Sequence, residues 1–273
     1  EICACLVGSE MCIRDRDIVG EKMVVGICQT DVVMGDTKYN LIAAEDYIHQ
    51  CSDKGVELAL FPEMSMTGFG LDPKNVAEKY GNGITVHTMT RFAMQYGIAL
   101  GFGYTACSAG KYTNRYVVVD SNGRIISDYA KIHPFSYSGE NLKYSAGNSL
   151  SQFEFDGTVI STFICYDIRF PEIFQAVSDD TEVIVVAANW PASRRDDWKL
   201  LLRARALENQ SYVLGINRYG WGGELYYSGD SMVVSPKGEM LNILSDGPGI
   251  IIEDIDIGAV REYSCLLYTS PSP

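Results

Sequence analysis

Two kinds of hydrophobic pattern alternate along most of this chain. Short apolar runs are typical of buried strands, and apolar positions that recur every three or four residues are typical of helices. The runs predict strands at residues 24–29, 57–61, 98–104, 159–164, 183–188 and 212–217. The helical spacing predicts helices at residues 40–54, 84–96, 170–177 and 196–209. Because strands alternate with helices, the pattern indicates an α/β fold.

Some of the strands are expected to pair in antiparallel fashion. Segments 116–120 and 124–129 flank Asn122 and Gly123, and an Asn-Gly pair between apolar runs favours a tight hairpin turn. Three more short runs predict strands at residues 231–235, 240–244 and 249–255, with no helical pattern between them. The predicted fold therefore combines strand–helix alternation with hairpins.

Composition narrows the class of protein. The chain has 273 residues, of which 47% are hydrophobic and 21% charged, so one large α/β domain is expected. The net charge of −13 argues against a nucleic-acid partner, whose backbone is itself negative. No run of about 18 apolar residues is present, so the sequence predicts no membrane partner.

The two ends of the chain differ from its middle. Residues 5–16 and 264–273 resemble translated sequencing-adapter read-through, so we predict non-native extensions at residues 1–22 and 264–273 around one domain at residues 23–263. Four of the eight cysteines fall in these extensions. The other four have neither C-x-x-C spacing nor histidine partners, which predicts no metal site, and their scatter favours a reducing compartment, the cytoplasm.

Cys165 is the first candidate for chemistry. It directly follows the predicted strand 159–164, and Pro171 stands where the first turn of a helix tolerates proline. A turn between a strand and a helix exposes the sulfur, and the partial positive charge of a helix N-terminus favours the thiolate. A buried structural cysteine is the other interpretation, and this segment alone leaves both open.

Glu63 and Lys131 are two further candidates. Glu63 directly follows the apolar strand 57–61 and Pro62, so it is expected at the carboxyl edge of a sheet, where α/β proteins place their sites. Lys131 follows the predicted hairpin and opens a long aromatic loop that contains glycines. Taken singly, the glutamate can be a loop-bracing acid and the lysine a solvated surface charge.

Taken together, the three segments resemble the nitrilase, or carbon–nitrogen hydrolase, superfamily. The resemblance covers residues 23–263, and the family's Glu, Lys and Cys map in order onto Glu63, Lys131 and Cys165. A second family glutamate maps onto Glu140. The resemblance implies a four-layer α-β-β-α sandwich, no cofactor or metal, and a homodimer formed through the helix after the nucleophile and the helix at 196–209. The family normally continues past residues 261–263 with a short apolar segment that is expected to be missing here.

Within this superfamily, the chain is most similar to the ω-amidase branch. The similarity rests on Asn189, Trp190 and Pro191, followed by Trp198 and segment 203–210. It implies a small-molecule substrate, a 2-oxo dicarboxylic acid monoamide. Asp197 departs from that branch, which has histidine before the tryptophan. A nitrilase, a carbamoyl-amide hydrolase, an amidase of deaminated glutathione and a catalytically silent binding module on the same fold remain alternatives, although a silent module could lose any of the four mapped residues freely.

The resemblance also implies a role for each mapped residue. Cys165 attacks the amide carbon, either as a thiolate or with concerted deprotonation, and Glu63 takes the thiol proton and gives it to the leaving nitrogen. Lys131 and the backbone N–H of Tyr166 stabilise the oxyanion, while Glu140 orients Lys131 or the water. Histidine is the commonest general base, so His133, two residues from Lys131, is an alternative base.

Several residues near these motifs have open roles. Asn189 and Trp190 are expected to form a wall of the pocket. Arg194 and Arg195 are the loop cations most able to bind a substrate carboxylate, and a solvated pair of charges is the other interpretation. Asp167 and Arg169 are expected to brace the turn, and Arg205 and Glu208, three residues apart on one helix, to pair structurally.

Overall fold

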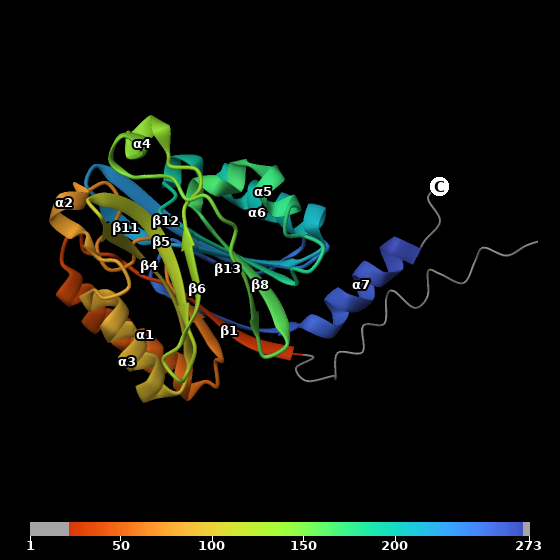
Figure 1. The fold of residues 1–273 in the computed structure, drawn as a ribbon. Coiled ribbons are helices and arrows are strands. Elements are labelled where there is room, and N and C mark those ends of the chain that lie inside the picture. Colours follow the sequence, from red (N-terminus) through yellow and green to blue (C-terminus); the bar gives the residue numbers. More distant parts are fainter. Residues whose placement is uncertain (1–21, 270–273) are drawn as a thin grey trace, which may run out of the picture.

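Two β-sheets stack face to face and carry helices on their outer sides (Figure 1). The structure, a computed structural model, describes residues 22–269. The strands of the first sheet are β1 (Lys22–Gln29), β2 (Leu58–Leu60), β3 (Glu78–Lys79), β4 (Ala99–Ser108), β5 (Lys111–Val119), β6 (Ile125–Ala130) and β14 (Gly249–Asp256). Their order is β14-β1-β2-β4-β5-β6, with β3 paired to β4.

The second sheet contains both parallel and antiparallel strand pairs. Its strands are β7 (Gln152–Phe155), β8 (Thr158–Ile164), β9 (Val183–Ala188), β10 (Tyr212–Asn217), β11 (Tyr219–Gly222), β12 (Leu225–Val234) and β13 (Met240–Ser245). Their order is β11-β12-β10-β9-β8-β7, with β13 paired to β12. The helices are α1 (Thr37–Asp53), α2 (Pro73–Val76), α3 (Ile84–Tyr96), α4 (Glu140–Lys143), α5 (Pro171–Gln175), α6 (Arg195–Asn209) and α7 (Ile257–Thr269).

Two apolar clusters hold the four layers together. The first contains side chains of both sheets and of α5 and α6, among them Ile27 and Tyr116 of the first sheet, Ile184 of the second and Leu202 of α6. In the second, α1 and α3 cover the outer face of the first sheet. Helix α1 buries Leu41, Ala44, Ile48 and Cys51, which recur at helical spacing on one side. The predicted α-β-β-α sandwich is therefore confirmed.

Parallel pairing brings the candidate strand ends to common edges. Strand β2 lies between β1 and β4 in parallel, and β9 lies between β8 and β10 in parallel. Ile164, the last residue of β8, pairs with Ala187 of β9, so the segments that follow these strands leave the sheet side by side. Those segments begin with Cys165 and Asn189.

Gly103 on β4 makes room for the turn after β2. A Cβ atom at this position would lie 2.3 Å from the backbone nitrogen of Met64 and 2.9 Å from Cα of Glu63. Met64 itself adopts a left-handed conformation with φ of 45°, which is uncommon for a residue other than glycine. The close approach of β4 and this turn positions the Glu63 backbone.

Most predicted elements are present. The differences are the end of one helix and several elements that the sequence pattern did not predict. Helix α5 ends at Gln175, two residues early, because the polar stretch Ser178, Asp179 and Asp180 follows it as a turn. The short strands β3, β7 and β11 and helix α7 were outside the predicted pattern. Of the predicted extensions, residues 1–21 and 270–273 lie outside the described residues, while Lys22 begins β1 and residues 264–269 continue α7.

Within residues 22–269, no helix is long and apolar enough to cross a membrane.

Candidate active site

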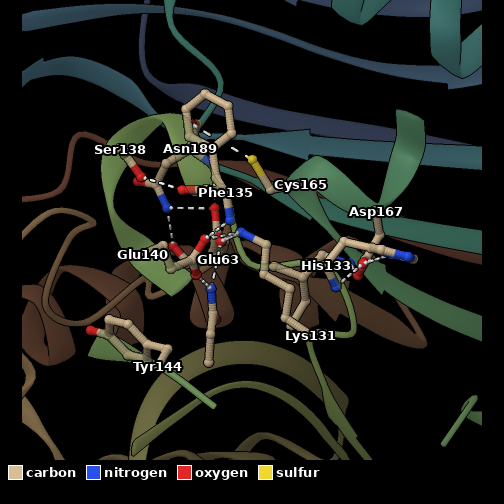
Figure 2. A network of polar contacts seen from close by, with 12 residues as sticks. Glu63, Lys131, His133, Phe135, Ser138, Glu140, Tyr144, Cys165, Asp167 and Asn189 are labelled. Atoms are coloured by element: carbon tan, nitrogen blue, oxygen red, sulfur yellow. Dashed lines mark hydrogen bonds and ion pairs between the residues drawn. The ribbon is translucent and has the colours of Figure 1, made fainter. Parts of the chain in front are cut away.

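The ends of three strands bring the three candidate residues to one place between the sheets. Glu63 follows β2, Lys131 follows β6 and Cys165 follows β8. Their exposed fractions are 0%, 1% and 9%, so all three are shielded from bulk solvent. Figure 2 shows the side chains converging, with Glu140 beside Lys131 and the sulfur of Cys165 directed toward Asn189.

Cys165 sits on a sharp turn. Its φ of 49° lies in the left-handed region, which costs a non-glycine residue energy and is typical of functional turns. The buried carboxylate of Asp167 braces this turn by accepting hydrogen bonds from the backbone nitrogen of Ile164 at 3.0 Å, the Tyr129 hydroxyl at 2.8 Å and the backbone nitrogen of His133 at 2.9 Å. The structure thus agrees with the bracing interpretation of Asp167.

The Cys165 sulfur is a thiol at neutral pH. Burial raises its pKa well above the ordinary value, and the negative charge of Glu63 raises it further, although Lys131 opposes both. The element that follows is a short 3-10 turn, Cys165–Arg169, and not the long helix whose dipole would favour a thiolate. Of the two routes left open by the sequence, attack as a thiolate and deprotonation concerted with attack, the raised pKa favours the second.

Lys131 joins the two buried glutamates. Its Nζ lies 2.9 Å from Glu63 Oε1 and 2.9 Å from Glu140 Oε2. Burial by itself would lower the pKa of Lys131, but the two carboxylates outweigh it and the pKa is raised well above the ordinary value. An ammonium has three donors, and two point at these carboxylates. The third can serve another acceptor.

Glu140 is held by three donors of its own. Besides Lys131, its Oε2 accepts the backbone N–H of Phe135 at 2.6 Å, and its Oε1 accepts the side-chain amide of Asn114 at 3.0 Å. Asn114 also donates to Glu63 Oε1 at 2.7 Å. The sequence analysis did not identify Asn114. The one feature that could have indicated it is its position in β5, where it is a polar residue on the same buried face as Tyr116 and Val118.

Asn189 forms hydrogen bonds with Glu63, a role that the sequence did not predict. Its backbone nitrogen donates to Glu63 Oε2 at 2.9 Å, and its side-chain Nδ2 donates to Glu63 O at 2.7 Å and to Oε2 at 3.2 Å. Its backbone carbonyl accepts from the Cys165 thiol at 4.0 Å. Asn189 also lines the cavity, as the sequence predicted, but its amide is directed at the carboxylate.

A cavity opens over these residues. Its volume is about 470 Å³ when the open solvent at its mouth is counted. Polar groups at its base converge under an aromatic and aliphatic wall. The wall is formed by Phe69, Phe135, Tyr166, Trp190, Leu225 and Tyr227.

Two arginines reach the cavity. The Arg194 guanidinium lies over the rings of Phe135, 5.0 Å from its centroid, and Trp190, 5.7 Å from its centroid. No carboxylate of residues 22–264 forms an ion pair with it. Arg169 also lines the cavity, but it pairs with Asp197 at 2.6 Å and lies over Trp190. The sequence anticipated a bracing role for Arg169 and missed its place at the cavity.

Arg195 is turned away from the cavity. It pairs with the buried Asp230 at 2.6 Å and with Asp246 at 3.3 Å, and Lys199 lies 3.0 Å from the same Asp230 oxygen. The expectation that Arg195 can meet a substrate carboxylate is therefore wrong, because its charge is already neutralised inside the fold.

His133 and Arg205 have structural partners. His133 Nδ1 lies 3.0 Å from Asp167 (Figure 2). Its ring stacks on Phe170, with centroids 3.7 Å apart. It is absent from the described lining of the cavity, so the alternative of a histidine base is not supported. Arg205 donates to Ile168 O at 3.0 Å and pairs with Glu208, in agreement with the structural role expected for both.

Among residues 22–264, no group of three or more His, Cys, Asp or Glu side chains is arranged to hold a metal ion. The chemistry that the described residues offer is therefore that of a thiol, two carboxylates and an ammonium.

Comparisons with known proteins agree with this arrangement. Residues 24–264 match the carbon-nitrogen hydrolase family. The 2-oxoglutaramate amidase of Bacillus subtilis strain 168 is 33% identical over 240 residues, which cover 86% of this chain and 92% of that protein. Omega-amidase YafV of Escherichia coli strain K12 is 34% identical over 211 residues, or 77% of this chain and 81% of that protein.

Solved structures share the fold. XC1258 of Xanthomonas campestris, a CN-hydrolase superfamily protein with an arsenic adduct in its active site, superposes with a TM-score of 0.85 at 27% identity, covering 92% of this chain and 99% of that one. An amidase from Nesterenkonia sp. superposes with a TM-score of 0.79 at 23% identity, covering 90% and 95% of the two chains.

Proposed function

The chain belongs to the carbon–nitrogen hydrolase family, a hydrolase family that acts on carbon–nitrogen bonds, and we propose that it is an ω-amidase. Its proposed substrate is the terminal amide of a small 2-oxo dicarboxylic acid monoamide, from which it releases ammonia. The amidases of Bacillus subtilis and Escherichia coli support this substrate class. The observation that carries the proposal is the buried Lys131 ammonium between Glu63 and Glu140, next to the thiol of Cys165.

The proposed reaction begins with the thiol. As the Cys165 sulfur attacks the amide carbon, its proton moves to Glu63, and the carbonyl oxygen becomes an oxyanion. The third donor of Lys131 and the backbone N–H of Tyr166 stabilise that oxyanion. Because Lys131 has a pKa well above its ordinary value, it stays charged throughout.

Glu63 then returns the proton. It protonates the leaving nitrogen, so ammonia departs as a neutral molecule and an acyl group remains on Cys165 as a thioester. Glu63 next takes a proton from water, which attacks the thioester carbon. The C–S bond then breaks, the acid leaves, and Glu63 returns the proton to the Cys165 sulfur. Glu140, which holds Lys131 from the other side, keeps the ammonium in place during both steps.

Substrate choice rests on charge at the mouth of the cavity. The protein carries a net charge of −13, so an anionic substrate needs a local cation. Arg194 supplies one, since it lines the cavity without a carboxylate partner among residues 22–264. Arginine is suited to a carboxylate because its planar fork can donate two parallel hydrogen bonds.

We also propose a homodimer formed through α5 and α6. Leu200 and Leu207 on α6 are 66% and 56% exposed, which leaves apolar surface on this face. The four cysteines among residues 22–264 are free, in keeping with a reducing compartment, and we propose the cytoplasm.

The direct test is an ammonia-release screen of the full chain. It compares 2-oxoglutaramate with neutral amides of similar size, and parent protein with Cys165→Ala. Release that is fastest from 2-oxoglutaramate and absent in the variant supports the proposal. No release from any amide by the folded parent would favour the silent binding module.

A further inference from the structure

Every acceptor position of the Glu63 carboxylate is occupied by a donor from the protein. A carboxylate offers about four lone-pair sites. Oε1 accepts from Asn114 Nδ2 and Lys131 Nζ, and Oε2 accepts from the backbone nitrogen and Nδ2 of Asn189. Glu63 is fully buried, so these four donors leave its carboxylate no free acceptor position for an incoming proton.

The thiol proton therefore has to displace one of these four donors. The longest contact is the one from Asn189 Nδ2 to Oε2, at 3.2 Å, and the other three are 2.7 to 2.9 Å. The same Nδ2 also donates to the backbone oxygen of Glu63 at 2.7 Å. Nδ2 of Asn189 can thus release Oε2 and still keep a hydrogen bond to Glu63, whereas each of the other three donors has only one hydrogen bond to Glu63.

Asn189 also contacts the nucleophile. Its backbone carbonyl accepts from the Cys165 thiol, so this one residue touches both the proton's donor and its acceptor. Among residues 22–264 it is the only hydrogen-bond partner of the Cys165 sulfur. The side chains of Asn189 and Cys165 approach from neighbouring parallel strands, β9 and β8.

The side-chain oxygens of Asn114 and Asn189 indicate which contacts orient these two amides. Oδ1 of Asn114 and Oδ1 of Asn189 are buried without a hydrogen-bond partner in the described part of the chain. Asn217, an equally buried neighbour, uses both ends: Nδ2 donates to Trp190 O and Gly229 O, and Oδ1 accepts from two backbone nitrogens. Asn217 is a structural asparagine, whereas Asn114 and Asn189 are oriented by what they donate to.

We propose that Asn189 is a positioning residue that controls the proton on Glu63. It holds Oε2 ionised in the resting enzyme and releases it when the Cys165 thiol transfers its proton. In that step the S–H bond breaks, an O–H bond forms on Oε2, and the electron pair left on sulfur forms the bond to the amide carbon. This inference rests on the proposed function for its chemistry and for the first of its two tests, whereas the second test needs no turnover.

Asn189 is a better probe than Asn114, since Asn114 also contacts Glu140. Among the described residues, those that act electrostatically with Glu63 are Lys131, Cys165, Tyr144 and Tyr227. Glu140 shares the Lys131 ammonium with Glu63 and is the other carboxyl group of this network, and Asn189 forms no hydrogen bond with it in the described part of the chain.

The test compares Asn189→Leu and Asn189→Asp with Asn217→Leu. For the parent and each variant, the acid limb of the kcat/KM profile for 2-oxoglutaramate is measured. Loss of one donor to the ionised carboxylate should move the acid limb of Asn189→Leu to higher pH by about one unit. Asn189→Asp keeps the size of the side chain but places a second carboxyl group beside Oε2, so the pair should share a proton and the limb should move further. Asn217→Leu should leave the limb in place.

A second measurement, which does not depend on activity, accompanies the kcat/KM profiles. The carbonyl stretch of protonated carboxyl groups is followed by infrared spectroscopy during a pH titration, and Glu63→Gln identifies the Glu63 band. The band should persist to a pH about one unit higher in Asn189→Leu than in the parent. If Asn189→Asp does not fold, the leucine variant alone decides the result.

Two results would overturn the inference. In the first, both Asn189 variants raise KM but leave the acid limb and the infrared band in place, which makes Asn189 a pocket wall. In the second, Asn217→Leu moves the acid limb and the infrared band by the same amount as Asn189→Leu. The effect would then come from general destabilisation of the site and not from Asn189. If the parent releases no ammonia but the band is shifted in Asn189→Leu, the proposed function fails, while the control of the Glu63 proton by Asn189 stands.

Discussion

The ammonium of Lys131 lies 2.9 Å from Oε1 of Glu63, although 68 residues separate the two in the chain. Both side chains are almost completely buried, at 1% and 0% exposure. A charge pair this deep is expensive to desolvate and stays only where further hydrogen bonds satisfy its remaining atoms. Here Glu140, Asn114 and Asn189 supply those bonds, so the site is a single network and each of its members can be tested against the others.

Cys165 is expected to carry the acyl group. After brief incubation with an amide substrate and an acid quench, intact-mass analysis should show an adduct, and peptide mapping should place it on Cys165. Cys165→Ser should lose most turnover because a hydroxyl is a much weaker nucleophile at neutral pH. Near-normal turnover in Cys165→Ser would contradict the assignment, and Cys28→Ser is the matched control at another buried cysteine.

Glu63→Gln should separate catalysis from thiol reactivity. Loss of the general base should lower kcat/KM by at least about a hundredfold. The Glu63 charge raises the pKa of Cys165, so its removal should lower that pKa and speed alkylation by iodoacetamide at a given pH, by roughly tenfold for each unit. A variant that loses turnover and alkylates at the parent's rate would argue against charge coupling between the two residues.

Lys131→Met should lower both activity and stability, with a defined pH dependence. Breaking a buried ion pair leaves uncompensated carboxylates and costs about 3–5 kcal/mol of unfolding free energy. The folded-state pKa of Lys131 is raised, so its contribution is complete below its unfolded-state pKa of about 10.4 and is lost as pH rises through the folded-state value.

Chemical denaturation of parent and Lys131→Met across this range measures the effect. The stability difference should be constant near neutral pH and should narrow above about pH 10.4. Lys199→Met, which removes a different lysine that contacts a buried carboxylate, is the control for activity. A difference that widens with rising pH would contradict the raised pKa of Lys131.

Arg194→Leu should change specificity. If the guanidinium binds the substrate carboxylate, KM for 2-oxoglutaramate should rise by the equivalent of roughly 1.5–3 kcal/mol, the scale of a hydrogen bond between charged groups. Neutral amides of the same size should be little affected. Arg195→Leu should instead lower the melting temperature, because it leaves Asp230 with one cation fewer. If Arg194→Leu treats acidic and neutral amides as the parent does, the carboxylate is bound elsewhere, and Arg169 is the next cation to test.

Light scattering on the full chain should give about twice the monomer mass if α5 and α6 form the proposed interface. The double variant Leu200→Glu and Leu207→Glu should give a monomer, because it places charges on the exposed apolar positions of α6. The matched control, Ile42→Glu on α1, should remain a dimer. A parent that is a monomer at all concentrations would remove the proposal.

The sequence by itself determined the elements and the order of the motifs. Apolar runs such as 183–188 and 84–96 coincide with β9 and α3 residue for residue, because a buried strand and an amphipathic helix each impose a local periodicity. The predicted strands 57–61, 124–129 and 159–164 place Glu63, Lys131 and Cys165 at or just past strand ends, which are local properties of the chain. The resemblance to the carbon–nitrogen hydrolase superfamily supplied Glu140 and the expectation that the four residues form one site.

Only the tertiary structure decided which atoms meet. Asn189 and Glu63 are 126 residues apart, and no local pattern announces that their atoms share a hydrogen bond. Arg194 and Arg195 are neighbours with the same chemistry, yet one lines the cavity and the other pairs with Asp230. The protonation of Cys165 likewise follows from burial and from the charge of Glu63. Desolvation and charge pairing depend on distance in space, and packing of the two sheets sets those distances.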